Sequence, residues 1–327
     1  LLIKVFFHRI KTELHDRKFL NEFYEWMESE GIKKNKIILL AHHKAHAWSA
    51  FSCSPFKEAL IITADGRGDF KSTTVSEANF RTGLKEIDFL TSFDSIGFLY
   101  AQVTKFLGFT PHRHEGKVTG LAAYGDPNKT ISVFKKIVSW NSILGHWNTN
   151  LKLYSPHNIN KLKSFNKILA QYKKEDIAAG VQKHCEDLIV QYIKFWLKKL
   201  KKKEPVNICL AGGLFANVKI NQKIAEINGV KNIFIFPNMG DGGLTVGGVC
   251  YKNFIDNKLT KVKFKNVYLG KNFNEKEILN SLSDNKDKIT FSKMSNRSVE
   301  ISKQLEENKV VGYFDGRMEF GPRALGS

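Results

Sequence analysis

The sequence lacks several features that would point to common classes of protein. Only four of its 327 residues are cysteine, and no two form a C-x-x-C pair. This argues against a disulfide framework or a zinc ribbon and favours a reduced, cytoplasmic setting. No apolar run approaches the roughly 18 residues that span a bilayer. The chain also has no G-x-S-x-G, no Walker A loop and no G-x-G-x-x-G, so covalent hydrolase chemistry and the common nucleotide loops are not indicated.

The two ends of the chain also lack the usual marks of a whole protein. The sequence opens on Leu-Leu-Ile-Lys without a starting Met and stops at Gly326-Ser327. Its opening residues are too few and too charged for a signal peptide. We therefore expect a fragment of a longer protein.

Lysine accounts for most of a strong positive charge. The net charge is +19, yet only eight of the 51 basic residues are Arg. Such a charge raises the question of a nucleic-acid partner. However, the lysines are spread along the chain, and the densest run, 198–203, closes a predicted helix, where cations interact favourably with the helix dipole. We therefore expect neither nucleic acid nor a membrane as partner.

Alternating strands and helices predict an α/β fold with a largely parallel sheet. The polar stretch at about 125–170 has no clear periodicity, and we interpret it as a variable insertion. A new pattern after about 265 indicates the start of a second domain, so we expect domains at 1–262 and 263–327. The expected strands are 37–41, 59–63 (paired in a hairpin with 72–76), 207–211, 232–236 and 310–314, and the expected helices are 42–51, 97–108, 115–124 and 175–200.

Two histidines and two aspartates form a candidate metal site. His42 and His46 stand one turn apart on a predicted helix, so both imidazoles project from one face. Asp65 and Asp241 each follow a predicted strand and precede glycines, at the position where α/β folds bind ligands. The aspartates could equally be turn formers or helix caps. Together the four would form a nitrogen and oxygen site suited to Fe(II), Mn or Zn.

Glycine-rich turns supply candidate ligand contacts. Gly212-Gly213 follows a predicted strand, and Asn217 opens the next helix, an arrangement that suits a phosphate or nucleotide and equally a plain tight turn. Lys117 could meet an anion or form a surface ion pair. His43 lies about 100° around the helix from His42 and cannot share the metal site by the same geometry.

Six segments together resemble the O-carbamoyltransferases of the NodU/CmcH type, over about 37–327 without the insertion. They occur in that family's order and are His42–Ala47, Ala64–Gly68, Glu115–Gly125, Gly212–Asn217, Met239–Gly243 and Gly316–Gly326. The resemblance implies a first domain of the actin-like ATPase (ribonuclease-H-like) superfold, similar to tRNA threonylcarbamoyl transferases. The start of a YrdC-like domain would follow it.

The resemblance also implies roles for individual residues. An iron-type metal would be held by His42, His46, Asp65 and Asp241. Nucleotide contacts would come from Gly66, Gly68, Gly212, Gly213, Asn217 and Gly240. Substrate contacts would come from Glu115, Glu319 and Arg323, and catalytic roles would fall to Lys117 and to His43 as general base.

The activity implied by the resemblance is transfer of a carbamoyl group to a hydroxyl of a small-molecule acceptor, a sugar or a natural product. The second domain would first make carbamoyladenylate from carbamoyl phosphate and ATP, with Mg for ATP use. Two departures stand out: the family's opening His-Asp-Ser/Ala-type segment has no match here, and the second domain stops just inside its first motif. We therefore do not expect this chain alone to make carbamoyladenylate.

Three alternative functions are also compatible with the sequence. A tRNA threonylcarbamoyl transferase would share the metal motif and explain the charge, although Gly321-Pro322-Arg323-Ala324-Leu325-Gly326 lies beyond the point where that enzyme ends. A sugar-kinase-like phosphotransferase would need Mg-ATP but no histidine–aspartate site. A basic scaffold would bind neither metal nor nucleotide. The acceptor stays open, and an oligomer is compatible with the sequence.

Overall fold

The computed structural model describes residues 17–256 and 261–324 of the chain, which divides into two compact units, 1–41 and 42–327. In the first unit, residues 17–29 are helical and η1 (Lys34–Lys36) is a short 3-10 helix. The strand predicted at 37–41 is wrong, because these residues form no regular secondary structure. A short apolar run does not make a strand without a hydrogen-bonded neighbour, and none of the described strands pairs with it.

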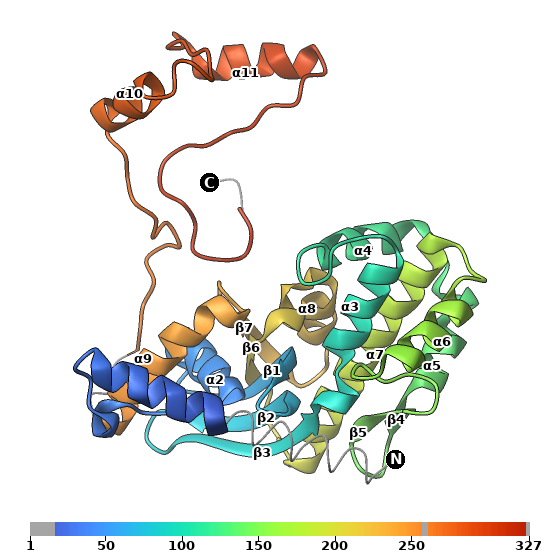
Figure 1. Ribbon diagram of the computed structural model, residues 1–327. Helices are drawn as coiled ribbons and strands as arrows, with labels where there is room; N and C mark the ends of the chain where they lie inside the picture. Colours follow the sequence, from blue (N-terminus) through green and yellow to red (C-terminus); the bar gives the residue numbers. More distant parts are fainter. Residues whose placement is uncertain (1–16, 257–260, 325–327) are drawn as a thin grey trace. The chain divides into compact units, whose positions relative to one another are not determined.

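The second unit is built on a five-stranded mixed sheet of order β3-β2-β1-β6-β7 (Figure 1). The antiparallel half is β1, β2 and β3, and the parallel half is β1, β6 and β7. The α/β class and the hairpin are confirmed. The expectation of a largely parallel sheet is wrong, because β3, which was not predicted, pairs antiparallel with β2 and extends the hairpin. The strands are β1 (Glu58–Gly68), β2 (Lys71–Asn79), β3 (Gly83–Thr91), β6 (Val206–Ala211) and β7 (Val230–Ile235).

Helices cover both faces of this sheet (Figure 1). One face carries α2 (His42–Cys53) and α9 (Leu244–Ile255). The other carries α3 (Ile96–Phe106), α7 (Lys174–Lys199) and α8 (Val218–Ala225). Along β1, Ile61 joins the α2 side of the core while Leu60 and Ile62 join the α7 side. Each such fully buried side chain contributes roughly 1.5–3 kcal/mol.

The polar stretch at about 125–170 is a folded part of the second unit. It contains α5 (Ile131–Ile137), the hairpin of β4 (Val138–Asn141) and β5 (His146–Thr149), and α6 (Ile159–Leu169). Phe134, Trp147 and Phe165 are fully buried in the core that includes α7. A few widely spaced aromatics anchor this segment, which is why its sequence shows little periodicity.

The remaining elements are short. They are η2 (Ser92–Asp94), α4 (Glu115–Leu121), η3 (Ala122–Tyr124), η4 (Pro127–Lys129), η5 (Gly213–Ala216), η6 (Asp241–Gly243), α10 (Glu275–Ser283) and α11 (Arg297–Glu306). The strand predicted at 310–314 is wrong, since these residues pair with no described strand. No helix among the described residues is long and apolar enough to cross a membrane.

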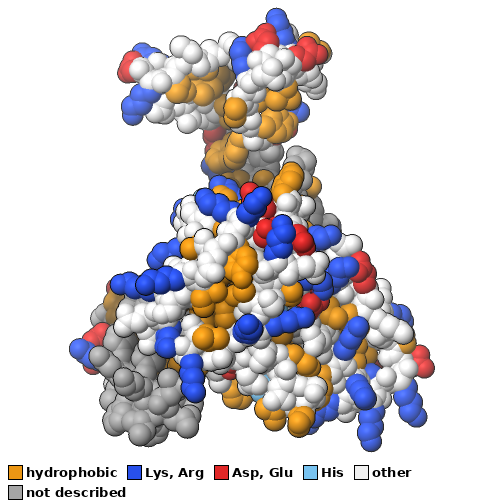
Figure 2. All heavy atoms as spheres, turned by 90° about the vertical axis from the view of Figure 1, so that its right-hand side faces the viewer, with side chains coloured by type: hydrophobic (Ala, Val, Ile, Leu, Met, Phe, Trp, Pro, Cys, Tyr) orange, Lys and Arg blue, Asp and Glu red, His pale blue; other side chains and the backbone are white. Residues whose placement is uncertain are grey.

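Basic side chains are scattered over the face of the molecule shown in Figure 2, interspersed with acidic and apolar ones. All four cysteines are free and buried.

Candidate metal centre and ligand cavity

Four side chains from three segments meet beside the carboxyl ends of β1 and β7. His42 and His46 come from the first turns of α2, Asp65 from β1 and Asp241 from the start of η6. One ligand atom from each lies within 4.8 Å of all the others. The Nε2 atoms of the two histidines are 3.1 Å apart, and Oδ2 of Asp65 is 3.2 Å from Nε2 of His46. The sequence therefore predicted which four side chains meet.

Local hydrogen bonds fix this arrangement. The backbone N–H of His42 donates to Oδ2 of Asp69 at 2.6 Å, which ties the start of α2 to the turn between β1 and β2. Asp69 adopts a positive φ of 48° in that turn. The N–H of Gly66 donates to Oδ1 of Asp65 at 2.6 Å. This bond leaves Oδ2 of Asp65 directed at His46.

The electrostatics keep Asp65 ionised. Burial opposes ionisation of Asp65, but His42 and His46, whose Nε2 atoms lie 3.6 and 3.2 Å from its Oδ2, outweigh burial and hold the pKa of that carboxyl well below its usual value. Burial would lower the pKa of His46, yet the nearby carboxylates of Asp241 and Asp65 raise it overall. Asp65 is thus an anion at any physiological pH, as a metal ligand must be.

The donor set fits a divalent metal ion. Two imidazole nitrogens face each other at hydrogen-bond distance while two carboxylates converge on the same point. The His46 side chain is fully buried, and that of Asp241 is 73% exposed. Two nitrogens and two carboxylate oxygens suit Fe(II), Mn(II) or Zn(II).

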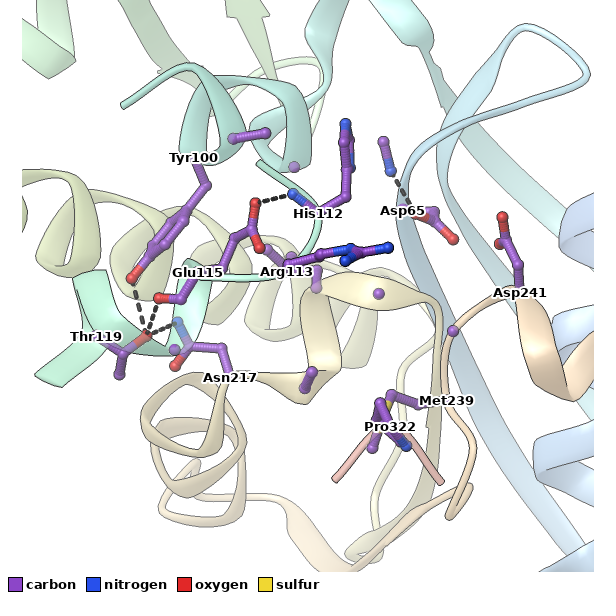
Figure 3. A pocket seen from close by; sticks show the side chains of 18 of the residues that line it. Asp65, Tyr100, His112, Arg113, Glu115, Thr119, Asn217, Met239, Asp241 and Pro322 are labelled. Atoms are coloured by element: carbon purple, nitrogen blue, oxygen red, sulfur yellow. Dashed lines mark hydrogen bonds between the residues drawn. The ribbon is translucent and has the colours of Figure 1, made fainter. Parts of the chain in front are cut away.

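A cavity of about 580 Å³ lies beside the cluster and shares Asp65 and Asp241 with it (Figure 3). Its lining includes three glycines and three polar residues, all of which were predicted from the sequence as ligand contacts. These are Gly66, Glu115, Gly213, Asn217, Gly240 and Arg323. The volume falls within the range of small-ligand sites.

Other predicted ligand contacts lie outside the cavity lining. Gly68 makes room for the ring of His42. Gly212 has a φ of +100°, and a Cβ there would fall 2.2 Å from the carbonyl oxygen of Ala64. Only glycine fits such a position without strain. Glu319 forms an isolated β-bridge with Tyr268.

The two predicted catalytic residues are also absent from the lining. His43 is 2% exposed, and its Nδ1 lies 2.7 Å from Oγ1 of Thr63, on the sheet side of α2. Burial lowers the pKa of His43 to about 4, so its ring is neutral. The ammonium group of Lys117 lies 5.8 Å from the ring centroid of Phe109.

His112 and Arg113 line the cavity and were missed by the sequence reading. His112 has a positive φ of 63°, and its N–H donates to Oε1 of Glu115 at 2.6 Å. This bond ties the turn before α4 to the first residue of that helix (Figure 3). The only available signal was the run His112-Arg113-His114 directly before Glu115.

Comparison with known proteins identifies the family. The family described as "Carbamoyltransferase N-terminus" matches residues 4–250. The chain belongs to this carbamoyltransferase family. Its curated relatives include the uncharacterized protein MJ1058 of Methanocaldococcus jannaschii, 34% identical over 92% of this chain and 52% of that protein. Nodulation protein NolNO of Sinorhizobium fredii is 28% identical over 90% of this chain and 43% of that protein.

This carbamoyltransferase chain spans about half the length of the curated relatives it matches. Among solved structures, HypF of T. kodakarensis is similar at a TM-score of 0.39 and 14% identity, over 74% of this chain and 40% of that one. The family resemblance expected from the sequence is confirmed by the family match, whose residues 4–250 include five of the six segments, and by the nodulation-protein relative.

Proposed function

We propose that this chain is the metal- and nucleotide-binding part of an O-carbamoyltransferase. The enzyme would transfer a carbamoyl group from carbamoyladenylate to a hydroxyl group of a small-molecule acceptor, a sugar or a natural product. The observation that carries the proposal is that Asp65 and Asp241 belong both to the histidine–aspartate cluster and to the wall of the cavity. A ligand in that cavity would therefore lie against the cluster.

The domain arrangement belongs to the same proposal. Residues up to about 262 would form a domain of the actin-like ATPase superfold, and 263–327 would begin a YrdC-like domain that makes carbamoyladenylate from carbamoyl phosphate and Mg-ATP. The three-layer α/β architecture and the family match support the first part. About half of each relative's length lies outside the matched part, which leaves room in those proteins for the second.

The transfer makes defined demands on the site. The acceptor oxygen attacks the carbamoyl carbon, the bond from that carbon to the phosphate oxygen breaks, AMP leaves, and the hydroxyl proton passes to a base. A divalent metal held by the four residues would supply Lewis-acid stabilisation of the developing negative charge. Gly66, Gly213 and Gly240 would let the ligand approach the backbone, and Arg113 and Arg323, which also line the cavity, would bind its anionic groups.

The transfer also needs a general base. The assignment to His43 stays a prediction, and the burial of its ring against Thr63 suits support of α2 better than proton transfer. His112 is the histidine that lines the cavity in the described part of the chain. A base must reach the proton it removes, and a histidine in the cavity wall is better placed for this than the buried ring of His43.

The direct test supplies the activated donor. Metal-loaded protein is mixed with freshly prepared, radiolabelled carbamoyladenylate and a panel of small hydroxyl compounds. We expect acceptor-dependent release of AMP with transfer of the label. Asp65→Asn should abolish it, whereas Asp88→Asn, on β3 outside the cavity lining, should leave it unchanged. Absence of transfer with every acceptor, or transfer of the ATP γ-phosphate to a sugar, would contradict the proposal, and the second result would favour the kinase-like reading.

A further inference from the structure

A buried side-chain amide lies directly behind the cavity wall. Gln182, on α7, is 6% exposed and is not itself part of the lining. Its Oε1 accepts hydrogen bonds from the hydroxyl of Tyr100 and from Nδ2 of Asn217, both at 2.8 Å. Its Nε2 donates to Oε1 of Glu186 at 2.8 Å and to Oδ1 of Asn217 at 3.1 Å. All four hydrogen-bonding positions of the amide are therefore used.

The carboxylate of Glu186 determines which way this amide faces. Glu186 is 8% exposed and, when ionised, can only accept hydrogen bonds. The NH2 end of Gln182 must therefore face Glu186, because the opposite orientation would set two acceptors against each other. The oxygen of Gln182 is then directed at Tyr100 and Asn217, toward the cavity.

Asn217 is fixed from both ends as a result. Its Oδ1 accepts from the N–H groups of Lys219 and Ile220 and so caps α8. Its Nδ2 faces Gln182 and the hydroxyl of Thr119, which lies 3.3 Å away. The Thr119 hydroxyl is also 2.9 Å from that of Tyr100, and in Figure 3 the contacts from Tyr100 and Asn217 converge on Thr119. Every hydrogen-bonding position of the Asn217 amide is thus used within the protein. The amide holds the Thr119 hydroxyl, which donates to the backbone oxygen of Glu115 at 3.2 Å and keeps one acceptor position at the cavity wall.

We infer that Gln182 is a positioning residue for ligand recognition. Through Asn217 it holds the Thr119 hydroxyl in place, so that Thr119 and the carboxylate of Glu115 can accept hydrogen bonds from the hydroxyl groups of the nucleotide's sugar. The inference rests on the proposed function for the presence of a nucleotide. The Thr119 oxygen and the Glu115 carboxylate are acceptors, as the two hydroxyl donors of a vicinal diol require, and both residues line the same cavity. A buried amide with every position satisfied fixes its neighbours more firmly than a solvated one does.

The test compares AMP with 2′,3′-dideoxy-AMP, which lacks the sugar hydroxyls, as ligands of metal-loaded protein in calorimetric titrations. We expect the wild type to bind AMP at least tenfold more tightly. Gln182→Met, which keeps the side-chain volume, should bring the two affinities within about twofold of each other and leave the metal content unchanged. Loss of general stability alone would weaken both ligands equally and would keep their ratio.

Two further variants keep the inference falsifiable if Gln182→Met does not fold. Tyr100→Phe removes one bond to Gln182 together with the contact to Thr119, and it should reduce the AMP preference partially. Its control is Tyr154→Phe, since the Tyr154 hydroxyl is equally buried but has no hydrogen-bond partner in the described structure. Tyr154→Phe should keep the full preference.

A double-variant cycle separates positioning from other effects. Asn217→Ser retains an oxygen that caps α8 but removes the amide. If Gln182 acts through Asn217, adding Gln182→Met to Asn217→Ser should cause no further loss of preference. If both Gln182→Met and Tyr100→Phe keep the full AMP preference, the inference about Gln182 is wrong, while the proposed function is unaffected. A metal-loaded wild type that binds neither nucleotide would overturn the proposed function along with it.

Discussion

The ring of His42 lies directly against Gly68, so that a Cβ built at position 68 would fall 2.1 Å from Cδ2 of that ring. Real Cβ atoms do not approach other heavy atoms so closely, and one of the two groups would have to move. Gly68 is at the end of β1, and His42 is the first residue of α2. The glycine therefore acts on the cluster by leaving space for one of its imidazoles.

Replacing this glycine should damage the metal centre. In Gly68→Ala the new methyl group would displace the His42 ring, and we expect metal affinity to fall ten- to hundredfold, the range typical of changes that reorient a ligand. Competition with a chromogenic chelator measures the affinity. Gly248→Ala is the matched control, because a Cβ at Gly248 meets nothing within 4 Å. Equal affinities in the two variants would show that His42 is not a ligand.

The packing of α2 on α9 should depend on one glycine of an adjacent pair. A Cβ at Gly247 would fall 1.9 Å from the backbone oxygen of Ala45, and backbone cannot swing aside as a side chain can. We expect Gly247→Ala to destabilise the fold by about 1–3 kcal/mol. Gly248→Ala should be neutral or stabilising by up to about 1 kcal/mol, the helix preference for Ala over Gly. Urea unfolding distinguishes these outcomes, and a neutral Gly247→Ala would contradict the packing.

Stability should fall with acidification through His184. Burial lowers the pKa of His184 to about 4, and its Nε2 donates to the carbonyl oxygen of Val138 at 2.8 Å. In the unfolded chain the His184 imidazole has an ordinary pKa of about 6.5. Between about pH 6.5 and 4 it is therefore protonated in the unfolded chain and neutral in the folded protein. The contribution of His184 is therefore complete above pH 7 and lost as pH falls toward 4, by up to about 3 kcal/mol.

The variant His184→Gln isolates this effect. Its stability deficit relative to the wild type should be largest at pH 7 and should shrink as the pH approaches 4.5. Urea unfolding at several pH values gives the comparison. A deficit independent of pH would mean that His184 is not held neutral in the folded protein.

Arg113 should bind the phosphate of a nucleotide. Its side chain lines the cavity, and it forms no ion pair in the described part of the chain. A charge-assisted hydrogen bond contributes roughly 1.5–3 kcal/mol, so Arg113→Ala should weaken AMP binding by about tenfold or more while adenosine binding changes little. Arg81→Ala, which removes the same charge from the exposed turn between β2 and β3, is the control. Equal losses for AMP and adenosine would rule out a phosphate contact.

The sequence predicted those parts of the fold that depend on local pattern. The i, i+4 spacing placed His42 and His46 on one helix face, and strands followed by Asp and Gly placed Asp65 and Asp241 at one edge of the sheet. β6 lies between β1 and β7, and the turn containing Gly213 follows β6. A Cβ on Gly213 would fall 3.3 Å from Oδ1 of Asp65, a proximity that strand order alone does not specify.

What the sequence could not supply depends on contacts distant in the chain. Residues 37–41 are apolar enough for a strand, but a strand also needs a hydrogen-bonded neighbour. His112 and Arg113 belong to no helical or strand-like sequence pattern. Their position depends on the turn before α4, which is held by the hydrogen bond from the His112 N–H to Glu115. Gln182 lies on a correctly predicted helix, yet its significance depends on Asn217, which is 35 positions away. Tertiary packing decides each of these cases.

The central claim is that His42, His46, Asp65 and Asp241 hold one metal ion at the cavity, and metal content tests it most directly. Protein purified anaerobically and reconstituted with Fe(II), Mn(II) or Zn(II) is analysed by mass spectrometry of its metals. We expect about one ion per chain, loss of it in His46→Ala and in Asp241→Ala, and retention in His146→Ala. Folded wild-type protein that retains none of the three metals would contradict the claim.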